Sequence, residues 1–418
     1  MPPVASSADR ITIARPAPRS SEPVRVLRAR GRTRVDWVRL GFAVLLFGIA
    51  LLTALPAPIR AAWLVGLVAG EGGHWLAPVA LLTLVPGWRA SAPGRIAGVL
   101  GIAAAFLFAM PAMLAFRMSH AVSAEVSRAF GPTPWAATAH ASRTNPVELL
   151  DLYTGVPIGD TRVRTLTFAT RDAEELRLDL HTAAQPAGPS PLLIIVHGGS
   201  WRTGDRTELD ALARYFAARG VAVAMPDYRL APDHRYPAAR DDVIAATAFL
   251  RARAADLGLD ASRVAYLGRS AGAQLAISTA VAAAGDPAVR GVVSLYGPLD
   301  LRWGYANPGN PRVLDGRAAL RGYLGGTPDE VPQQYDDASP VTGVDPRMPP
   351  VLMIHGARDD LVSPVHTERF AARMEWAGQR HLALILPWAT HGCDAILRGP
   401  CGQITLYAVE RFLGDVLR

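Results

Sequence analysis

Three residues, widely separated in the sequence, have side chains of the kinds used in nucleophilic catalysis. Ser270 lies in GRSAG, Asp359 in HGARDDLVSP and His391 in PWATHG. A serine hydroxyl is a poor nucleophile until a base removes its proton, and that base needs a carboxylate to orient it. We therefore expect Ser270 to attack a carbonyl carbon, His391 to act as general base and then acid, and Asp359 to orient the histidine. Asp360 is the competing carboxylate.

Two glycines are placed to stabilise the anion that such an attack creates. Gly198 and Gly199 follow the apolar run Leu192–Val196, and Ala271 follows Ser270. Backbone N–H groups aligned on a developing oxyanion lower the barrier to acyl transfer. We expect those of Gly198, Gly199 and Ala271 to form an oxyanion hole. The alternative is that the two glycines only provide flexibility for a tight turn after a strand.

Apolar runs and helix-forming stretches must position these residues. Thr161–Ala169 and Glu175–His181 alternate in the manner of a β-hairpin. After them, short runs rich in Val, Ile and Leu alternate with Ala-rich stretches, which predicts an α/β fold with a mainly parallel sheet. Ser270 then lies in a strand-to-helix turn that holds its backbone in a strained conformation. The runs are Leu192–Val196, Val221–Met225, Arg263–Leu267, Val289–Leu295, Val351–Ile354 and Leu382–Leu386.

Several motifs together resemble the α/β-hydrolase fold over about residues 150–418. They are HGGSW, DYRLAP, GRSAG, HGARDDLV and the HG at 391–392. Within this fold they are similar to the hormone-sensitive-lipase-like carboxylesterases and to the related acetyl-esterase and feruloyl-esterase groups. The resemblance implies hydrolysis of carboxylic esters through an acyl-enzyme, with no metal or organic cofactor. It also implies structural roles for His197 and His355, although each of them follows a strand.

The sequence departs from that family at two positions near the expected site. Ser200 stands where a third glycine is common, so we expect the oxyanion loop to be held differently. Arg269 stands where the family often has Asp. A cation there would favour a substrate with negative charge; the alternative is a solvent-facing arginine paired with a nearby acid.

Three apolar segments precede this region and predict membrane-spanning helices at about 40–59, 61–86 and 96–116. The first and third contain no charged residue, and about 20 residues of helix cross a hydrocarbon core of about 30 Å. The second is interrupted by Glu71-Gly72-Gly73-His74. We interpret it as one span with a polar centre, which would face other helices or a cavity. The alternative is a re-entrant pair of short segments.

The positive charge is concentrated before the first of these segments. Residues 1–39 contain nine Arg and three acidic residues, so they carry +6 of the formal net charge of +7. We expect a disordered tail that stays in the cytoplasm. Three spans then place the remaining chain outside the cytoplasm. A nearly neutral body with one basic tail predicts no nucleic-acid partner.

The only two cysteines, Cys393 and Cys401, follow His391 closely. A zinc site would need a fourth ligand, and the spacing matches none of the usual zinc patterns. In an extracytoplasmic domain the pair can form a disulfide that fixes the loop after the catalytic base. The alternative is two unpaired buried thiols.

The expected organisation is a basic tail (1–39), a membrane region (40–117), a linker (118–149) and a catalytic domain (150–418) with a small cap at about 300–340. The expected function is a membrane-anchored serine hydrolase that cleaves small or lipid-like carboxylic esters. One alternative is a peptidase or lipid acyl hydrolase on the same triad. Another is a non-catalytic binding module in the membrane.

Overall fold

The computed structural model describes residues 22–135 and 142–418, and it contains a sheet of eight strands. The order of the strands is β1-β2-β4-β3-β5-β6-β7-β8. The strands are β1 (Thr161–Arg171), β2 (Glu174–Ala183), β3 (Ser190–Val196), β4 (Ala222–Pro226), β5 (Leu259–Arg269), β6 (Val289–Leu295), β7 (Val351–Gly356) and β8 (His381–Leu386). The two strands β1 and β2 form the predicted hairpin, β2 pairs antiparallel with β4, and all other neighbours are parallel. The predicted mainly parallel α/β sheet is therefore confirmed.

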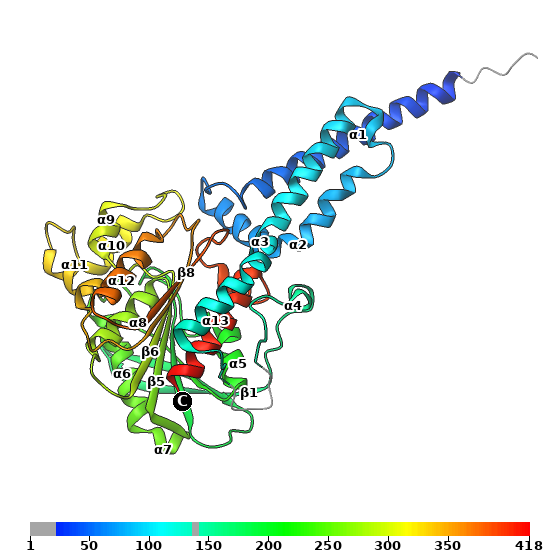
Figure 1. Ribbon diagram of the computed structural model, residues 1–418. Helices are drawn as coiled ribbons and strands as arrows, with labels where there is room; N and C mark the ends of the chain where they lie inside the picture. Colours follow the sequence, from blue (N-terminus) through cyan, green and yellow to red (C-terminus); the bar gives the residue numbers. More distant parts are fainter. Residues whose placement is uncertain (1–21, 136–141) are drawn as a thin grey trace, which may run out of the picture.

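Helices cover both faces of this sheet (Figure 1). Helices α5 and α13 pack on one face, and α6, α8 and α12 on the other. The α-helices of the α/β region are α4 (Leu149–Thr154), α5 (Asp210–Ala218), α6 (Ala238–Ala252), α7 (Ala254–Leu257), α8 (Ala271–Ala282), α9 (Leu301–Ala306), α10 (Gly316–Leu324), α11 (Pro332–Ala338), α12 (Val365–Trp376) and α13 (Pro400–Val416). Helices α9 to α11 lie between β6 and β7 in the sequence, at the position expected for a cap.

Strand β3 illustrates why the sheet is buried on both faces. Leu193 and Ile195 belong to the core shared with α5 and α13, whereas Leu192, Ile194 and Val196 belong to the core shared with α6 and α8. Successive side chains of a strand point to opposite faces, so a continuous apolar run is needed where helices cover both. This arrangement brings the carboxyl ends of the parallel strands to one edge, where the chemistry-bearing loops follow.

Three long helices form a bundle that projects from the α/β region (Figure 1). They are α1 (Glu22–Leu51), α2 (Arg60–Leu81) and α3 (Ala92–Phe130), with short 3₁₀ turns at Leu82–Leu84 and Trp88–Ala90. Among the described residues, two segments are long and apolar enough to cross a membrane, 60–84 and 92–130.

The structure corrects the expected boundaries at three places. Helix α1 begins at Glu22, so residues 22–39 of the expected disordered tail are helical, while residues 1–21 lie outside the described part. The apolar run 40–59 contains Pro56 and Pro58, and the helix ends at Leu51. Its uncharged helical part, 40–51, is only about 18 Å long, so the expected first span is too long.

The expectation of a linker at 118–149 is also wrong for residues 118–130, which are helical. Helix α3 continues to Phe130 because Val122, Val126 and Phe130 recur every four residues and form a buried stripe. Phe130 packs edge-on against Phe412 of α13, with ring centroids 4.9 Å apart. Residues 142–149 are anchored too, since Arg143 is buried and forms an ion pair of 2.6 Å with Asp151.

Helix α2 runs unbroken through Glu71-Gly72-Gly73-His74, which excludes the re-entrant alternative. Its polar centre faces the α/β region. Glu71 Oε2 accepts a hydrogen bond of 2.9 Å from the backbone N–H of Cys401, and His74 Nε2 donates one of 2.8 Å to the backbone oxygen of Leu152. The middle of α2 is therefore docked on the α/β region.

Candidate active site

Ser270 lies in the turn between β5 and α8, as expected. Its backbone has φ 55° and ψ −122°, a strained conformation for a residue other than glycine. Glycines on both sides make the turn possible. A methyl group at Gly268 would approach the backbone oxygen of Gly272 to 2.1 Å, and one at Gly272 would approach that of His197 to 2.2 Å. Strand β3, strand β5 and helix α8 therefore pass too close for any larger residue.

The structure brings Ser270, His391 and Asp359 together in one hydrogen-bonded chain. His391 Nε2 lies 2.9 Å from Ser270 Oγ, and His391 Nδ1 lies 2.6 Å from Asp359 Oδ2. Asp359 follows β7 and His391 follows β8, so each side chain comes from the carboxyl end of a parallel strand. In this arrangement Nδ1–H donates to the carboxylate, which leaves Nε2 free to accept the serine proton.

The carboxylate of Asp359 is buried but fully supported. Its Oδ1 accepts backbone hydrogen bonds from Leu361 at 2.9 Å and Val362 at 2.8 Å. Burial would raise the pKa of Asp359, but interactions with His391 and His355 hold this pKa well below its usual value. The side chain therefore stays ionised beside His391.

The competing carboxylate, Asp360, points elsewhere. Its Oδ2 accepts a hydrogen bond of 3.3 Å from the backbone N–H of Ala57, in the loop between α1 and α2. The two other histidines considered above, His355 near the end of β7 and His197 directly after β3, bond to the scaffold instead of the serine. His355 contacts Thr367 Oγ1 at 2.8 Å and the backbone oxygen of Val362 at 2.9 Å, and His197 stacks on Tyr228.

The glycine loop after β3 lies beside the serine. A methyl group at Gly198 would lie 3.5 Å from Ser270 Cβ, and Gly199 has φ 102°, which favours glycine. Ser200 also adopts a positive φ, 55°, so the residue that replaces the third glycine accepts the left-handed conformation. Within the described residues, no acceptor binds the backbone N–H groups of Gly198, Gly199 and Ala271.

Trp201, the residue after Ser200, anchors the glycine loop that follows β3. The indole of Trp201 donates a hydrogen bond of 2.9 Å to Gln274 Oε1 on α8 and stacks on Tyr323 of α10 at 4.3 Å. The amide of Gln274 in turn donates to the backbone oxygen of Ala338 on α11 at 2.8 Å. The loop is therefore held jointly by α8 and by two of the helices at the cap position.

A buried cluster that the sequence did not predict supports the loop of His391. The side chain of Arg269 forms an ion pair of 3.3 Å with Asp394 and donates to the backbone oxygen of Gly392 at 3.3 Å. The hydroxyl of Tyr296 bonds to both Arg269 and Asp394, and its ring centroid lies 4.6 Å from that of His391. Arg269 is thus paired with a nearby acid, although it is shielded from solvent.

The same loop is closed by a disulfide between Cys393 and Cys401, as predicted. Both residues are buried. Because both sulfur atoms are in the bond, the zinc-ligand and free-thiol alternatives are excluded. The signal that could have revealed the whole cluster is Arg269 itself, since a cation next to the nucleophile needs a buried partner.

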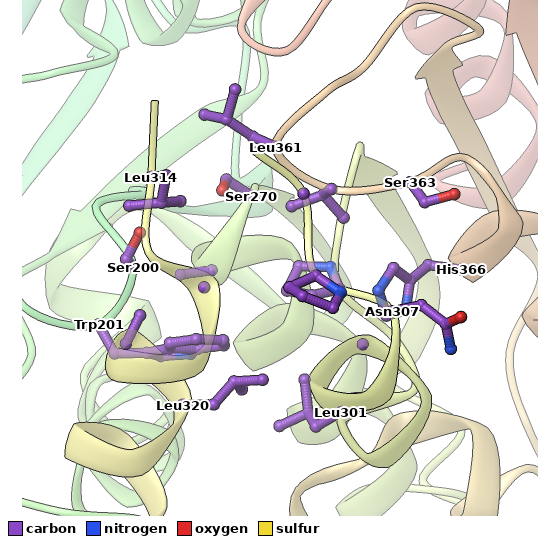
Figure 2. A pocket seen from close by; sticks show the side chains of 18 residues that line it. Ser200, Trp201, Ser270, Leu301, Asn307, Leu314, Leu320, Leu361, Ser363 and His366 are labelled. Carbon is purple, nitrogen blue, oxygen red and sulfur yellow. The ribbon is translucent and has the colours of Figure 1, made fainter. Parts of the chain in front are cut away.

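Two cavities meet at Ser270. The smaller, of about 60 Å³, lies beside helices α9 and α10, and its apolar lining is interrupted by Ser200, Asn307, Ser363 and His366. Figure 2 shows Trp201, Leu301 and Leu320 enclosing it. The larger cavity, of about 570 Å³, contains His391, Gly198 and Gly199, and is bordered by Trp63 and Leu67 of helix α2. No sequence pattern indicated that a bundle helix borders the site.

Comparison with known proteins agrees with this geometry. The family model described as BD-FAE matches residues 178–374. The chain is 33% identical over 246 residues to esterase LipC of Mycobacterium tuberculosis, a match covering 56% of this chain and 60% of LipC. It is 31% identical over 246 residues to ethyl acetate hydrolase of Pseudomonas putida, covering 55% of this chain and 74% of that protein.

Two solved structures have the same fold. A bacterial heroin esterase is 26% identical with a TM-score of 0.55, covering 63% of this chain and 87% of the other. An esterase of Pyrobaculum calidifontis is 26% identical with a TM-score of 0.54, covering 61% of this chain and 86% of the esterase. The chain covers only 60% of LipC and 55% of the related Mycobacterium tuberculosis protein LipM, a probable carboxylic ester hydrolase. The bundle α1–α3 lies before the matched family region.

Proposed function

Because the chain belongs to the hormone-sensitive-lipase-like esterases of the α/β-hydrolase fold, we propose that it hydrolyses carboxylic esters through an acyl-enzyme on Ser270. The observation that carries this proposal is the hydrogen-bonded chain from Ser270 through His391 to Asp359. The small residues Gly198, Gly199 and Ala271 supply backbone donors beside it. The names of the relatives, esterase and ethyl acetate hydrolase, support the same class of substrate.

The proposed reaction proceeds in two steps. As Ser270 Oγ bonds to the carbonyl carbon, His391 Nε2 takes the hydroxyl proton and Asp359 stabilises the imidazolium. The N–H groups of Gly198, Gly199 and Ala271 stabilise the oxyanion. The proton passes to the alcohol oxygen as the C–O bond breaks and the alcohol leaves. Water then attacks the acyl-enzyme, His391 again serves as base and then acid, and the carboxylic acid is released.

The smaller cavity favours short acyl groups. It lacks His391, whereas the alcohol must leave beside Nε2 of that residue, so we assign the acyl group to this side. One water-sized sphere needs about 10–15 Å³, so a cavity of about 60 Å³ accepts only a few heavy atoms. Leu301, Leu320 and Trp201 close its far end. Acetyl to butyryl esters are therefore the proposed substrates.

We also propose that the bundle anchors the protein in a membrane. Large apolar side chains are exposed along it, and contiguous exposed apolar surface of this kind marks an interaction with lipid or a partner. They include Phe42, Leu45, Val68, Val99 and Phe106. The far end of the bundle is polar, with exposed Arg89 and Arg95. By the positive-inside rule this end is cytoplasmic and the α/β region extracytoplasmic.

Hydrolysis of p-nitrophenyl esters from acetate to laurate by the full chain in detergent tests the catalytic proposal. We expect acetate and butyrate to be turned over fastest, and Ser270→Ala to lower kcat by at least about 10⁴-fold. A preference for long chains would favour the lipid acyl hydrolase alternative, and cleavage of peptides instead of esters the peptidase. A folded protein inert towards every ester and peptide would favour the binding module.

A fusion of alkaline phosphatase to Arg418 tests the orientation. This enzyme is active only after export, so we expect activity, and a green fluorescent protein with the same fusion point serves as the inverse reporter. An inactive phosphatase fusion together with a fluorescent green fluorescent protein fusion would contradict the proposed topology while leaving ester hydrolysis untouched.

A further inference from the structure

One face of helix α2 forms a wall of the larger cavity. Arg60, Trp63 and Leu67 all line it, and their spacing of three and four residues places them on one side of the helix. The wall reaches the residue next to His391. A methyl group at Gly392 would lie 3.9 Å from Leu67 Cδ2 and 4.0 Å from Trp63 Cζ2. The helix is therefore part of the active-site cavity.

This wall is held firmly against the α/β region. Before α2, the backbone N–H of Ala57 donates to Asp360 Oδ2 at 3.3 Å, and Asn310 Nδ2 donates to the backbone oxygen of Ala57 at 2.9 Å. Further along, Glu71 and His74 bond to the backbone of the α/β region. Contacts lie on both sides of Trp63 and Leu67 along the chain, so these two side chains keep a fixed position at the cavity.

The larger cavity is the side from which the alcohol leaves. A leaving alkoxide needs a proton from His391 Nε2, and His391 lines this cavity and not the smaller one. The alcohol moiety of a bound ester therefore extends into a space of about 570 Å³ bordered by α2. The apolar side chains of Val313, Leu314 and Leu361 border this cavity together with Trp63 and Leu67. The charged side chains that also line it are Arg60, Arg202, Glu208 and Arg269.

The outward face of the same helix is apolar and exposed. Leu64, Val65 and Val68 alternate along α2 with the residues that line the cavity. In the proposed membrane anchor these side chains face lipid, so the alcohol-side cavity lies next to the bilayer surface, separated from it by one helix.

We propose that Trp63 and Leu67 determine specificity for the alcohol part of the ester, and that the substrates are short-acyl esters of long apolar alcohols. The inference rests on the proposed ester hydrolysis and names its substrate class. An apolar alcohol would lie against the indole of Trp63 and the side chain of Leu67 while the short acyl group occupies the smaller cavity. The bundle would then both anchor the enzyme and shape its substrate.

Alkyl acetates from ethyl to decyl acetate test this with the full chain in lipid nanodiscs, with acid release followed by titration. We expect kcat/KM of wild type to rise with alkyl length. Trp63→Ala should lower kcat/KM for decyl acetate about tenfold or more, with ethyl acetate changed far less. Leu67→Phe, which narrows the cavity, should have the same selective effect.

Matched variants at positions of α2 that do not line the larger cavity serve as controls: Leu64, and Trp75, whose ring packs against Tyr153 of α4. Trp75→Ala and Leu64→Phe make the same chemical changes at exposed positions, and we expect both to keep the wild-type ratio between decyl and ethyl acetate. The substrate partitions into lipid equally for all variants. A changed ratio of kcat/KM between decyl and ethyl acetate therefore results from the change in the cavity wall.

The failure of this inference differs from the failure of the proposed function. If Trp63→Ala and Leu67→Phe hydrolyse acetates with the wild-type ratio of kcat/KM between decyl and ethyl acetate, the proposed role of α2 is overturned. Equal loss in the control variants would likewise overturn it, because the effect would not belong to the cavity face. No hydrolysis of any acetate by folded wild type would instead contradict the esterase proposal itself.

Discussion

At the scale of single residues, the site depends on a buried carboxylate that remains ionised. Asp359 accepts hydrogen bonds from two backbone N–H groups and from His391, which together offset the cost of burial. The neighbouring carboxylate, Asp360, is directed to the loop before α2. The two adjacent aspartates therefore have different partners. A substitution of Asp360 can serve as the control for the same substitution of Asp359.

Asp359→Asn should lower kcat by about 10³–10⁴-fold, because an amide at this position no longer selects the histidine tautomer that accepts the serine proton. KM for p-nitrophenyl acetate should change little. Steady-state kinetics with Asp360→Asn as the control checks this, since that variant should stay within a few-fold of wild type. Equal losses in both variants would contradict the assignment of Asp359.

At the scale of elements, the loop between β8 and α13 is the most constrained part of the site. The disulfide Cys393–Cys401 closes it, and the ion pair between Arg269 and Asp394 ties it to the residue before the nucleophile. Both features act on the segment that carries His391. A rigid loop keeps the base within reach of the serine without a further ordering cost during the reaction.

Replacing both cysteines by alanine should lower the free energy of unfolding by roughly 2–3 kcal/mol, the chain-entropy value for a loop this short. Urea unfolding of the double variant beside wild type, with and without reductant, measures the difference. Alanine fills the buried positions without adding a polar group. A double variant as stable as oxidised wild type would show that the disulfide contributes nothing.

The contact between α2 and α3 offers a second test at this scale. A methyl group at Gly73 would approach the backbone oxygen of Phe108 to 2.2 Å, whereas one at Gly72 meets nothing within 4 Å. Gly73→Ala should therefore separate the helices and cost about 1–3 kcal/mol, while Gly72→Ala should be neutral or slightly stabilising. Thermal unfolding in detergent compares them; equal midpoints would contradict the packing.

The elements of the α/β region were predictable, and the docking of α2 was not. Val/Ile/Leu runs such as 192–196 and 351–354 mark strands directly, and each functional residue follows such a run. Strand ends that meet at one edge of a sheet then bring Ser270, Asp359 and His391 together. An apolar helix, however, has the same composition whether it faces lipid or protein. The polar residues Glu71 and His74 predicted some partner, but nothing in the sequence identified it as the loop at Cys401.

At the scale of the whole molecule, the bundle and the α/β region share one core. Leu67, Ala115, Val122 and Phe130 belong to the same apolar cluster as α13. The bundle is therefore an integral part of the fold. Long-range packing of this kind cannot be read from hydropathy, which explains why residues 118–149 were expected to be a linker.

Stability should fall as the pH is lowered from about 6.5, in part because of His366. Burial and the nearby His355 lower the pKa of His366 from 6.5 to about 3. Below pH 6.5 the unfolded chain takes up a proton at this residue and the folded protein does not, so acid favours unfolding until pH 3. Asp300, Asp359 and Arg369 also face this histidine. The two carboxylates raise the pKa of His366, and Arg369 lowers it.

Between pH 6.5 and pH 5 the loss attributable to His366 is about 2 kcal/mol. His366→Gln should therefore flatten the pH dependence of urea unfolding in this range, even if the variant is less stable throughout. The exposed His120 provides the control, and His120→Gln should retain the wild-type slope. An unchanged slope in His366→Gln would contradict the assignment.

The most direct test of the central claim is covalent labelling of the full chain by diethyl p-nitrophenyl phosphate, followed by mass spectrometry of its peptides. The account predicts one diethylphosphoryl group on Ser270, loss of ester hydrolysis in step with labelling, and no labelling of Ser270→Ala. An unlabelled Ser270 in the folded protein, or inactivation through a different residue, would contradict it.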